Sequence, residues 1–330
     1  MDIALGVRAK SKWTSTVERK AAFAAAFSPY VDASLALKEL AGVSVSSSEI
    51  DRIGQEHGAR IDKQQRKLES EFLAPIDPLQ KQLVQENSCE KLVIQADATC
   101  VLTVAGEEHK SVYCGTVFPL EARGEKGERP FLSERLYTAS AIDMEDFSPR
   151  LKALAWRGGM RGAQTAFVGD GARCLWKWAE ENLPPDTVFI QDFWHVCEHL
   201  SQLSQTLFPD DWTERFFKWK DWLRSSQMDL LLAELEELHT QRRGSARQAL
   251  ESELGYLRAG RHRMDYARYE REGWLIGSGA IEGTCKQLVK ARFGVTGARW
   301  RRENIPHILA LRLAVFNKEW EAYWEIPDAA

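Results

Sequence analysis

Hydrophobic residues recur at helical intervals over positions 14–60, and this spacing predicts a helical N-terminal region. The turn at 41–43 contains Gly42, and the serines that follow it are suited to cap a helix. A helix, a glycine turn and a serine-capped helix are typical of a DNA-binding helix-turn-helix, although small helical domains of other kinds share the pattern. The expected helices are 17–27, ended by Ser28-Pro29, then 31–40 with Ala33, Leu37 and Leu40 on one face, and a third from Ser46-Ser47-Ser48 to His57.

Residues 59–90 are strongly charged and predict a linking helix over 61–72, which Pro75 and Pro78 end. From position 91 the pattern changes to short apolar runs that alternate with helical stretches. Three strands followed by alternating helix and strand indicate a mixed α/β sheet. The expected strands are 92–97, 109–119, 135–142, 165–170 and 187–192, and the expected helices are 147–156, ended by Gly158-Gly159, and 172–182.

Residues 196–272 lose the strand pattern and carry leucines at helical spacing, which predicts an α-helical insertion. A glycine-containing turn at 275–279 then leads into a helix that begins near Glu282. We therefore expect an α/β protein with a helix-turn-helix-like region, a linking helix, and a sheet core that the insertion divides. The expected boundaries are 1–60, 61–90, 91–200 for the first part of the core, 201–272 for the insertion, and 273–330 for the second part.

Three of the expected strands end in a carboxylate, at Asp97, Asp170 and Asp192. Aspartate is a poor strand former, and ligands of open α/β sheets bind at the carboxyl ends of the strands. A single such aspartate would be read as a cap of the following turn or helix. Three of them, together with Glu282 after a Gly-Ser-Gly turn, indicate a shared acidic site.

Clustered carboxylates repel one another unless a cation neutralises them, and hard oxygen ligands select Mg²⁺ or Mn²⁺. Two such ions about 4 Å apart promote the cutting and joining of phosphodiester bonds. A phosphatase is the rival interpretation, because Gly169-Asp170-Gly171 resembles a motif of haloacid-dehalogenase-like enzymes. That family needs a second aspartate two residues from the first, and Asp97 has Gln95 and Thr99 there instead.

His195 and His199 stand four residues apart and would share one helix face, where Asp192 could complete a metal site with them. A bare pair of histidines is a weak signal, because Cys197 between them falls on another face. We expect His195 to orient Asp192 or to contact phosphate, and His199 to be an ordinary core histidine.

The chain has 330 residues, of which 44% are hydrophobic and 28% charged, a composition that excludes global disorder. It has no apolar run of the ~20 residues that a membrane span needs, and no secretory pattern at its start, so we expect a cytoplasmic protein. The six cysteines form no CxxC pair, which leaves a zinc ribbon unsupported. The net charge is −4, but 258–302 carries +7 and 1–20 carries +3, so local phosphate binding and a solvated basic face are both open.

Several of these motifs, in this order, resemble bacterial insertion-sequence transposases of the Kra type, which are relatives of the Mutator-like elements. The resemblance covers nearly the whole chain. It rests on 169–172 (Gly-Asp-Gly-Ala), Trp176, 192–200 (Asp-Phe-Trp-His-Val-Cys-Glu-His-Leu), 277–282 (Gly-Ser-Gly-Ala-Ile-Glu), Cys285-Lys286, Arg292, Gly297, Arg299-Trp300, 309–312 and Trp320, with 4–7 and 43–46 resembling the family's helical region.

The resemblance implies a ribonuclease-H-like core with a DDE triad of Asp97, Asp170 and Glu282 holding two Mg²⁺ or Mn²⁺ ions. The Asp-x-x-His of Mutator-like relatives falls on Asp192 and His195, which would support the site. Water would cut the DNA strand, and the exposed 3′-OH would then attack target DNA. The expected partners are transposon ends and target DNA, bound by a homodimer in the nucleoid. The phosphate-binding residues are expected to be Lys286, Lys290, Arg292, Arg299, Arg301 and Arg302.

Family members are commonly longer at the N-terminus and often carry a cysteine-rich zinc module there, so the resemblance implies a shortened chain that starts just before the helical region. Two alternatives follow. One is a catalytically silent DNA-binding remnant or regulator, against which the intact triad argues. The other is a stand-alone structure-specific nuclease, which would share the triad but not the joining step. Trp194 and Trp300 could stack on bases, although core packing is the expected role of most of the twelve tryptophans.

Overall fold

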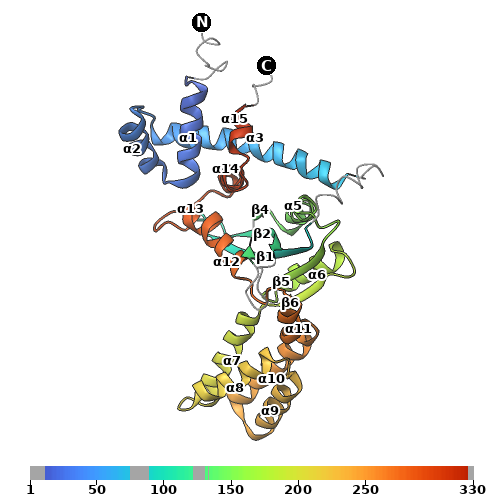
Figure 1. The fold of residues 1–330 in the computed structure, drawn as a ribbon. Coiled ribbons are helices and arrows are strands. Elements are labelled where there is room, and N and C mark those ends of the chain that lie inside the picture. The colour runs from blue at the N-terminus through green and yellow to red at the C-terminus, as the bar shows by residue number, and fades with distance from the viewer. Residues whose placement is uncertain (1–11, 75–88, 122–130, 133, 326–330) are drawn as a thin grey trace.

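The structure is a computed structural model that describes residues 12–74, 89–121, 131–132 and 134–325. The predicted segment at 4–7 and the helix-ending Pro75 and Pro78 lie outside this part. Three tiers are visible in Figure 1: N-terminal helices at one end, a sheet in the middle and a bundle of helices at the other end. The predicted α/β class is therefore confirmed in its coarse form, a mixed sheet with abundant helix.

The N-terminal tier is built from α1 (Ser15–Phe27), α2 (Tyr30–Ala41) and α3 (Ser47–Leu73). As predicted, Gly42 ends α2 in a left-handed conformation and the Ser46 hydroxyl caps α3. One prediction was wrong. The third helix does not end at His57 but runs on as one 27-residue helix, so no break separates it from the linking helix. Leu40, on the helix face of Ala33 and Leu37, is 88% exposed, whereas those two residues are buried.

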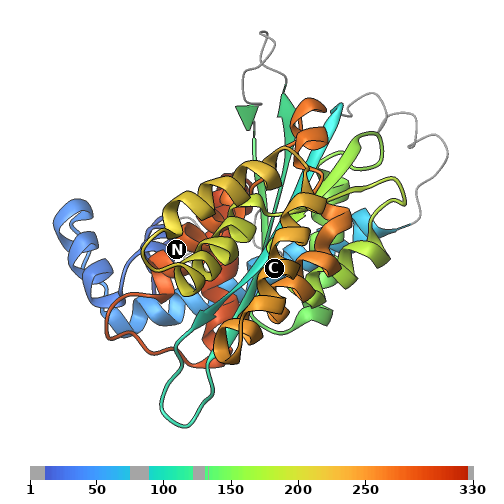
Figure 2. The same ribbon diagram turned by 90° about the horizontal axis from the view of Figure 1, so that it is seen from below.

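The sheet has the strand order β3-β2-β1-β5-β6, and β4 pairs with β2 on the same side as β3. Strands β1, β3 and β4 are antiparallel to β2, whereas β5 runs parallel to β1 and β6 parallel to β5. Figure 2 views the strands from below, with the helices on both sides of them. The strands are β1 (Lys91–Val101), β2 (Lys110–Glu121), β3 (Phe131–Leu132), β4 (Leu136–Ser140), β5 (Gln164–Gly169) and β6 (Val188–Gln191).

Alternate residues of β1 enter different hydrophobic cores, as the two-residue period of a strand requires. Leu92 and Ile94 pack with α5 (Met144–Arg157) and α6 (Arg173–Asn182) on one face. Val93 packs with the helical insertion on the other face. The sheet is thus covered on both sides, which explains why its strands read as nearly continuous apolar runs.

The helical insertion forms the third tier and packs around Leu231, Leu235 and Trp219. Its first helix already begins at Phe193, so the predicted boundary at 200/201 falls inside a helix. Tyr266 and Tyr269 donate hydrogen bonds to the backbone carbonyls of Gln191 and Phe189 in β6, which fixes the insertion to the sheet. The elements are α7 (Phe193–Leu207), α8 (Trp212–Arg224), α9 (Met228–Gln241), α10 (Gly244–Gly260), η2 (Arg261–Arg263) and α11 (Tyr266–Arg271).

After the insertion the chain returns to the sheet and then to the N-terminal tier, where α14 packs on α1 and α3. No helix among the described residues is long and apolar enough to cross a membrane. The returning elements are α12 (Gly279–Thr284), a π-helical turn η3 (Cys285–Lys290), α13 (Ala291–Phe293), η4 (Arg302–Asn304), α14 (Ile305–Phe316) and α15 (Trp320–Glu325).

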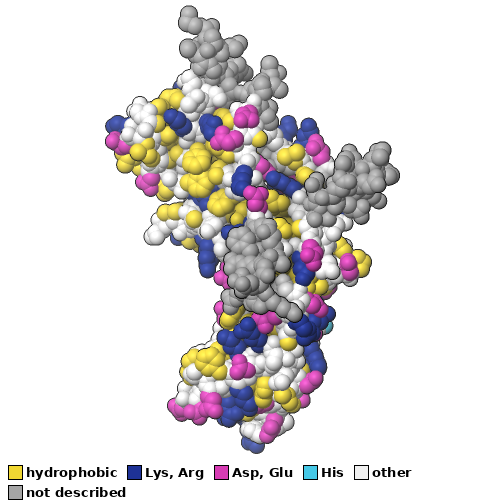
Figure 3. Space-filling model, viewed as in Figure 1, with side chains coloured by type: hydrophobic (Ala, Val, Ile, Leu, Met, Phe, Trp, Pro, Cys, Tyr) yellow, Lys and Arg dark blue, Asp and Glu magenta, His cyan; other side chains and the backbone are white. Residues whose placement is uncertain are grey.

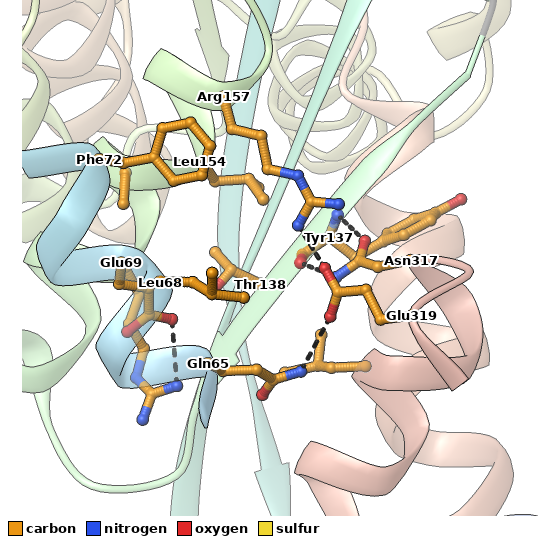
Figure 4. Close-up of a pocket in the computed structure, with 13 residues that line it drawn as sticks. Gln65, Leu68, Glu69, Phe72, Tyr137, Thr138, Leu154, Arg157, Asn317 and Glu319 are labelled. Atoms are coloured by element: carbon orange, nitrogen blue, oxygen red, sulfur yellow. Dashed lines mark hydrogen bonds and ion pairs between the residues drawn. The ribbon is translucent and has the colours of Figure 1, made fainter. Parts of the chain in front are cut away.

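A cluster of charged side chains, here called the α3–α5 joint, fixes α3 to the sheet tier. Arg150, only 4% exposed in its side chain, donates to Asp62 at 2.8 Å, to Asp146 at 3.1 Å and to Glu69 at 3.4 Å. Arg66 adds a second ion pair to Asp146 at 2.6 Å. Beside the joint lies a small cavity of about 40 Å³, shown in Figure 4, where Glu319 accepts from Gln65 and Arg157.

Candidate active site

Asp97 and Asp170 lie side by side in the chain direction, each just beyond the last residue pair of the parallel strands β1 and β5. The last parallel pair of β1 and β5 is Gln95 with Val168, and each aspartate stands two residues further on. β1 does not end at Asp97 as predicted, because β2 continues to pair with it as far as Val101. β5, in contrast, ends at Gly169 and no longer pairs with β1 beyond Gln95. The site therefore opens at this unpaired edge of β1, beside Asp97.

Glu282 reaches the same place from α12, in the second half of the core. The three carboxylates line one cavity of about 100 Å³, so the structure brings together the residues of the predicted triad. The other side chains that line it are those of Ala96, Asp192, Trp194, His195, Glu198, Ser278 and Ile281.

The cavity is unfavourable for the negative charge of Asp97. Burial raises the pKa of its carboxyl group above the usual value, and the charges of Asp170 and Glu282 raise it further. The N–H of Ala98 and the thiol of Cys285, 3.8 Å away, partly offset this effect. The raised pKa indicates that burial first, and the neighbouring like charges second, make the ionised form of Asp97 costly in this fold.

Little within the protein neutralises the three charges. Among the described residues, no lysine or arginine forms an ion pair with Asp97 or Asp170, and only Lys286 approaches Glu282, at 3.4 Å. The Asp170 carboxylate accepts one hydrogen bond, from the N–H of Ala172 at 3.2 Å. Glu282 remains 56% exposed.

Gln95 couples the strand of Asp97 to the turn that carries Glu282, a role that the sequence analysis did not identify. Its buried side chain donates to the carbonyl of Gly277 and accepts from the N–H of Ile281, both at 3.0 Å. The signal available in the sequence was a glutamine within an apolar run. If such a run forms a buried strand, the amide of the glutamine needs hydrogen-bond partners.

Asp192 lines the cavity, but its oxygens are engaged elsewhere. It is 2% exposed and caps α7, with Oδ1 accepting from the N–H groups of Trp194 at 2.6 Å and His195 at 3.2 Å. Oδ2 accepts from the backbone N–H of Ser278 at 2.9 Å and from its hydroxyl group. The helix-capping interpretation therefore holds for Asp192, which positions α7 and the turn before Glu282.

The two histidines do not form a metal site with Asp192. His195 lines the cavity with a 36% exposed side chain, and its Nδ1 lies 3.9 Å from Glu198. His199 instead bonds Glu253 at 3.1 Å and stacks on Tyr256 with ring centroids 4.3 Å apart. The hydrogen bond to Glu253 raises the pKa of His199 above its usual value.

The predicted phosphate-binding residues divide into exposed and buried ones. Lys286, Lys290, Arg299, Arg301 and Arg302 are exposed, although Arg302 also donates to the carbonyl of Glu108 at 2.8 Å.

Arg292 was wrongly assigned to phosphate binding. It is 3% exposed, donates to the carbonyl of Ala25 at 2.9 Å and lies over the rings of Tyr30 and Trp300. Its place after the π-helical turn directs it toward α1, where it holds the N-terminal tier.

The donor set of the cavity fits a hard divalent cation in kind, because carboxylate oxygens are the ligands that Mg²⁺ and Mn²⁺ prefer. With the side chains as they stand, no group of three or more His, Cys, Asp and Glu residues in the described ranges is arranged to hold a metal ion. Binding would therefore require the side chains of Asp97, Asp170 and Glu282 to turn toward the ion.

No protein-family model matches the chain, and no curated protein matches it either.

Proposed function

We propose that this protein is a DDE transposase of a bacterial insertion sequence, which cuts and joins DNA phosphodiester bonds at the cavity of Asp97, Asp170 and Glu282. The observation that carries the proposal is the convergence of these three carboxylates from distant parts of the chain on one cavity. The antiparallel strands followed by parallel ones support a ribonuclease-H-like core.

Asp97, Asp170 and Glu282 would hold two Mg²⁺ or Mn²⁺ ions, which supply charge neutralisation and an activated nucleophile when bound. The rest of the chemistry lies in how the chain positions these groups. Gln95 fixes the turn before Glu282 to β1, and Asp192 fixes the same turn to α7 through Ser278. His195 faces the cavity from the first turn of α7, where it would contact the scissile strand.

Cutting breaks the P–O bond to the leaving 3′-oxygen as a water oxygen forms a bond to phosphorus. Joining repeats the substitution with the freed 3′-OH as nucleophile on target DNA, so the number of phosphodiester bonds is conserved in that step. The exposed cations Lys286, Lys290, Arg299 and Arg301 would hold the DNA backbone without reading its sequence. We further propose that two copies act together on paired DNA ends in the bacterial nucleoid.

The test is metal-dependent nicking of supercoiled plasmid by the purified protein, compared with Asp97→Asn, Asp170→Asn and Glu282→Gln. Each change is expected to lower the rate by at least about 100-fold while plasmid binding persists. Glu251→Gln, at an exposed glutamate of α10 that does not line the cavity, is the matched control and should cut normally. Cleavage that survives in Asp97→Asn would show that the site is wrong.

A second assay separates a transposase from a stand-alone nuclease. Pre-cut DNA with a free 3′-OH is offered together with an intact plasmid, and covalently joined products are sought on a denaturing gel. Joined products that depend on Glu282 support the transposase, whereas cutting without joining indicates a nuclease. Plasmid binding without cutting in Mg²⁺ or Mn²⁺ would favour the silent DNA-binding remnant.

A further inference from the structure

Trp194 has an environment that core packing does not explain. All twelve tryptophans of the chain lie in the described residues, and Trp194 is the only one among them that is more than a third exposed, at 50%. It stands in the first turn of α7 and lines the cavity of Asp97, Asp170 and Glu282. A half-exposed indole in the wall of this cavity, beside the three carboxylates, is placed to contact a ligand that enters it.

The indole is held in place although it is not buried. Its backbone N–H is bound by Asp192, and Phe193 packs edge-on against it at 5.2 Å. The ring lies so close to Gly277 that a Cβ atom there would approach the indole to 2.9 Å. Because the ring is already positioned, a ligand that binds it has little side-chain entropy to overcome.

A cation accompanies the ring. Lys220 of α8 places its Nζ 4.8 Å from the centroid of the Trp194 ring, and 5.8 and 6.0 Å from those of Phe216 and Phe217. No ion pair to Lys220 is found among the described residues. An aromatic face with an adjacent lysine is the combination that binds single-stranded nucleic acid, the ring stacking on a base and the cation meeting a phosphate.

We propose that Trp194 stacks on an unpaired nucleobase next to the scissile phosphate, and that Lys220 leaves the ring to pair with the neighbouring phosphate. This inference rests on the proposed function, which brings the phosphate into the cavity that Trp194 lines. It adds a substrate class: DNA with a frayed or unpaired nucleotide at the site of cutting, bound in preference to a continuous duplex. Stacking tolerates any base, so no sequence preference is expected from this contact.

The test compares binding of two fluorescein-labelled DNAs without divalent metal, a forked oligonucleotide with unpaired ends and the same sequence fully paired. Trp194→Ala should weaken binding of the forked DNA about tenfold and leave duplex binding within about twofold. Trp194→Phe keeps an aromatic face and should retain most of the affinity. Phe23→Ala is the matched control, since Phe23 is 44% exposed on α1, does not line the cavity and is not among the rings near Lys220.

A further variant, Gly277→Ala, keeps the tryptophan but displaces it, and should weaken forked-DNA binding as Trp194→Ala does. A 2-aminopurine base at the unpaired position gives a direct readout, because stacking quenches its fluorescence. Quenching is expected with the wild type and Trp194→Phe and should be absent in Trp194→Ala.

The proposal would be overturned if Trp194→Ala weakened forked and duplex binding equally. It would also be overturned if Phe23→Ala weakened forked-DNA binding as much as Trp194→Ala does. A wild type that does not prefer the forked DNA would overturn it as well. The proposed function fails separately: if the wild type binds and quenches the forked DNA but never cuts it with Mg²⁺ or Mn²⁺, stacking stands and the phosphodiester chemistry does not.

Discussion

The α3–α5 joint and the acidic cavity both gather carboxylates, but only the joint pairs them with arginine. In the joint, Asp62, Glu69 and Asp146 surround the buried Arg150, and Arg66 adds a second cation. In the cavity, by contrast, the single cation in reach is Lys286, at the exposed Glu282, as far as the described residues show.

This difference in pairing with cations distinguishes carboxylates that stabilise the fold from carboxylates that are free to bind a cation from solution. Burial would raise the pKa of Asp146, but a hydrogen bond from Ser140 and then the guanidinium groups of Arg150 and Arg66 hold it below its usual value. Burial and like charges instead raise the pKa of Asp97. Glu69 is the exception within the joint, because burial raises its pKa despite Arg150. Charge that the protein leaves unneutralised in a cavity is more informative about function than charge as such.

The largest effect is expected from removing the cation of the joint. Arg150→Ala leaves three partly buried carboxylates facing one another and should lower the free energy of unfolding by about 3–5 kcal/mol. Urea denaturation followed by circular dichroism measures it. Arg301→Ala, at an exposed arginine, is the control and should change stability by less than about 0.5 kcal/mol. A small loss in Arg150→Ala would mean that the joint does not fix α3 to the sheet.

Removing one carboxylate of the joint should cost less and should depend on pH. Asp146→Asn is expected to lose about 2 kcal/mol at neutral pH, the scale of hydrogen bonds to a charged group. Because the folded-state pKa of Asp146 is lowered, its contribution is present above the unfolded value near 3.8 and disappears as the pH falls through the lower folded-state value. Unfolding free energies of wild type and variant between pH 3 and 7 should therefore converge at the acidic end. Parallel curves would contradict the assignment.

Divalent cations should act on the cavity and leave the joint unaffected. Mg²⁺ or Mn²⁺ at about ten times its dissociation constant should stabilise the wild type by about 1.4 kcal/mol. The stabilisation should be absent in Asp170→Asn and present in Asp146→Asn, and thermal unfolding with and without the ion measures both. Equal stabilisation of the two variants would place the ion elsewhere.

The smallest effect has the opposite sign. Asp97→Asn removes a charge that the fold holds at a cost, so it should stabilise the protein without metal by about 0.5 kcal/mol. The urea midpoint at neutral pH is the measurement, with Asp62→Asn as the matched change in the joint, expected to destabilise. If both variants destabilise alike, the contrast between the two clusters is wrong.

Local patterns in the sequence predicted most elements, because their signals lie within a few residues. Gly42 and Gly158 end helices as expected, and the apolar run that begins at Leu92 predicted β1. The extent of two elements could not be predicted. β1 passes Asp97 because a distant strand keeps pairing with it, and α3 passes His57 because α14 and α5 lie along it.

The members of the candidate site were predicted from the sequence, but their ranking was not. Nothing local distinguishes Asp192 from Asp97 and Asp170, since all three follow apolar runs. The distinction comes from Ser278, 86 positions away, whose backbone and hydroxyl occupy one oxygen of Asp192. Arg292 was misassigned for the same reason, because its partner Ala25 stands 267 positions away.

The unbroken helix α3 has a mechanical consequence. Its 27 residues span about 40 Å, and it is fastened to α14 near one end and to Arg150 near the other. Because the helix is continuous and rigid, a displacement or rotation of the N-terminal tier is transmitted along it directly to the sheet. One residue inserted near Ile61 would rotate one end of the helix by about 100° relative to the other and lengthen it by about 1.5 Å. The contacts at its two ends therefore fix both the length of the helix and the rotation between these ends.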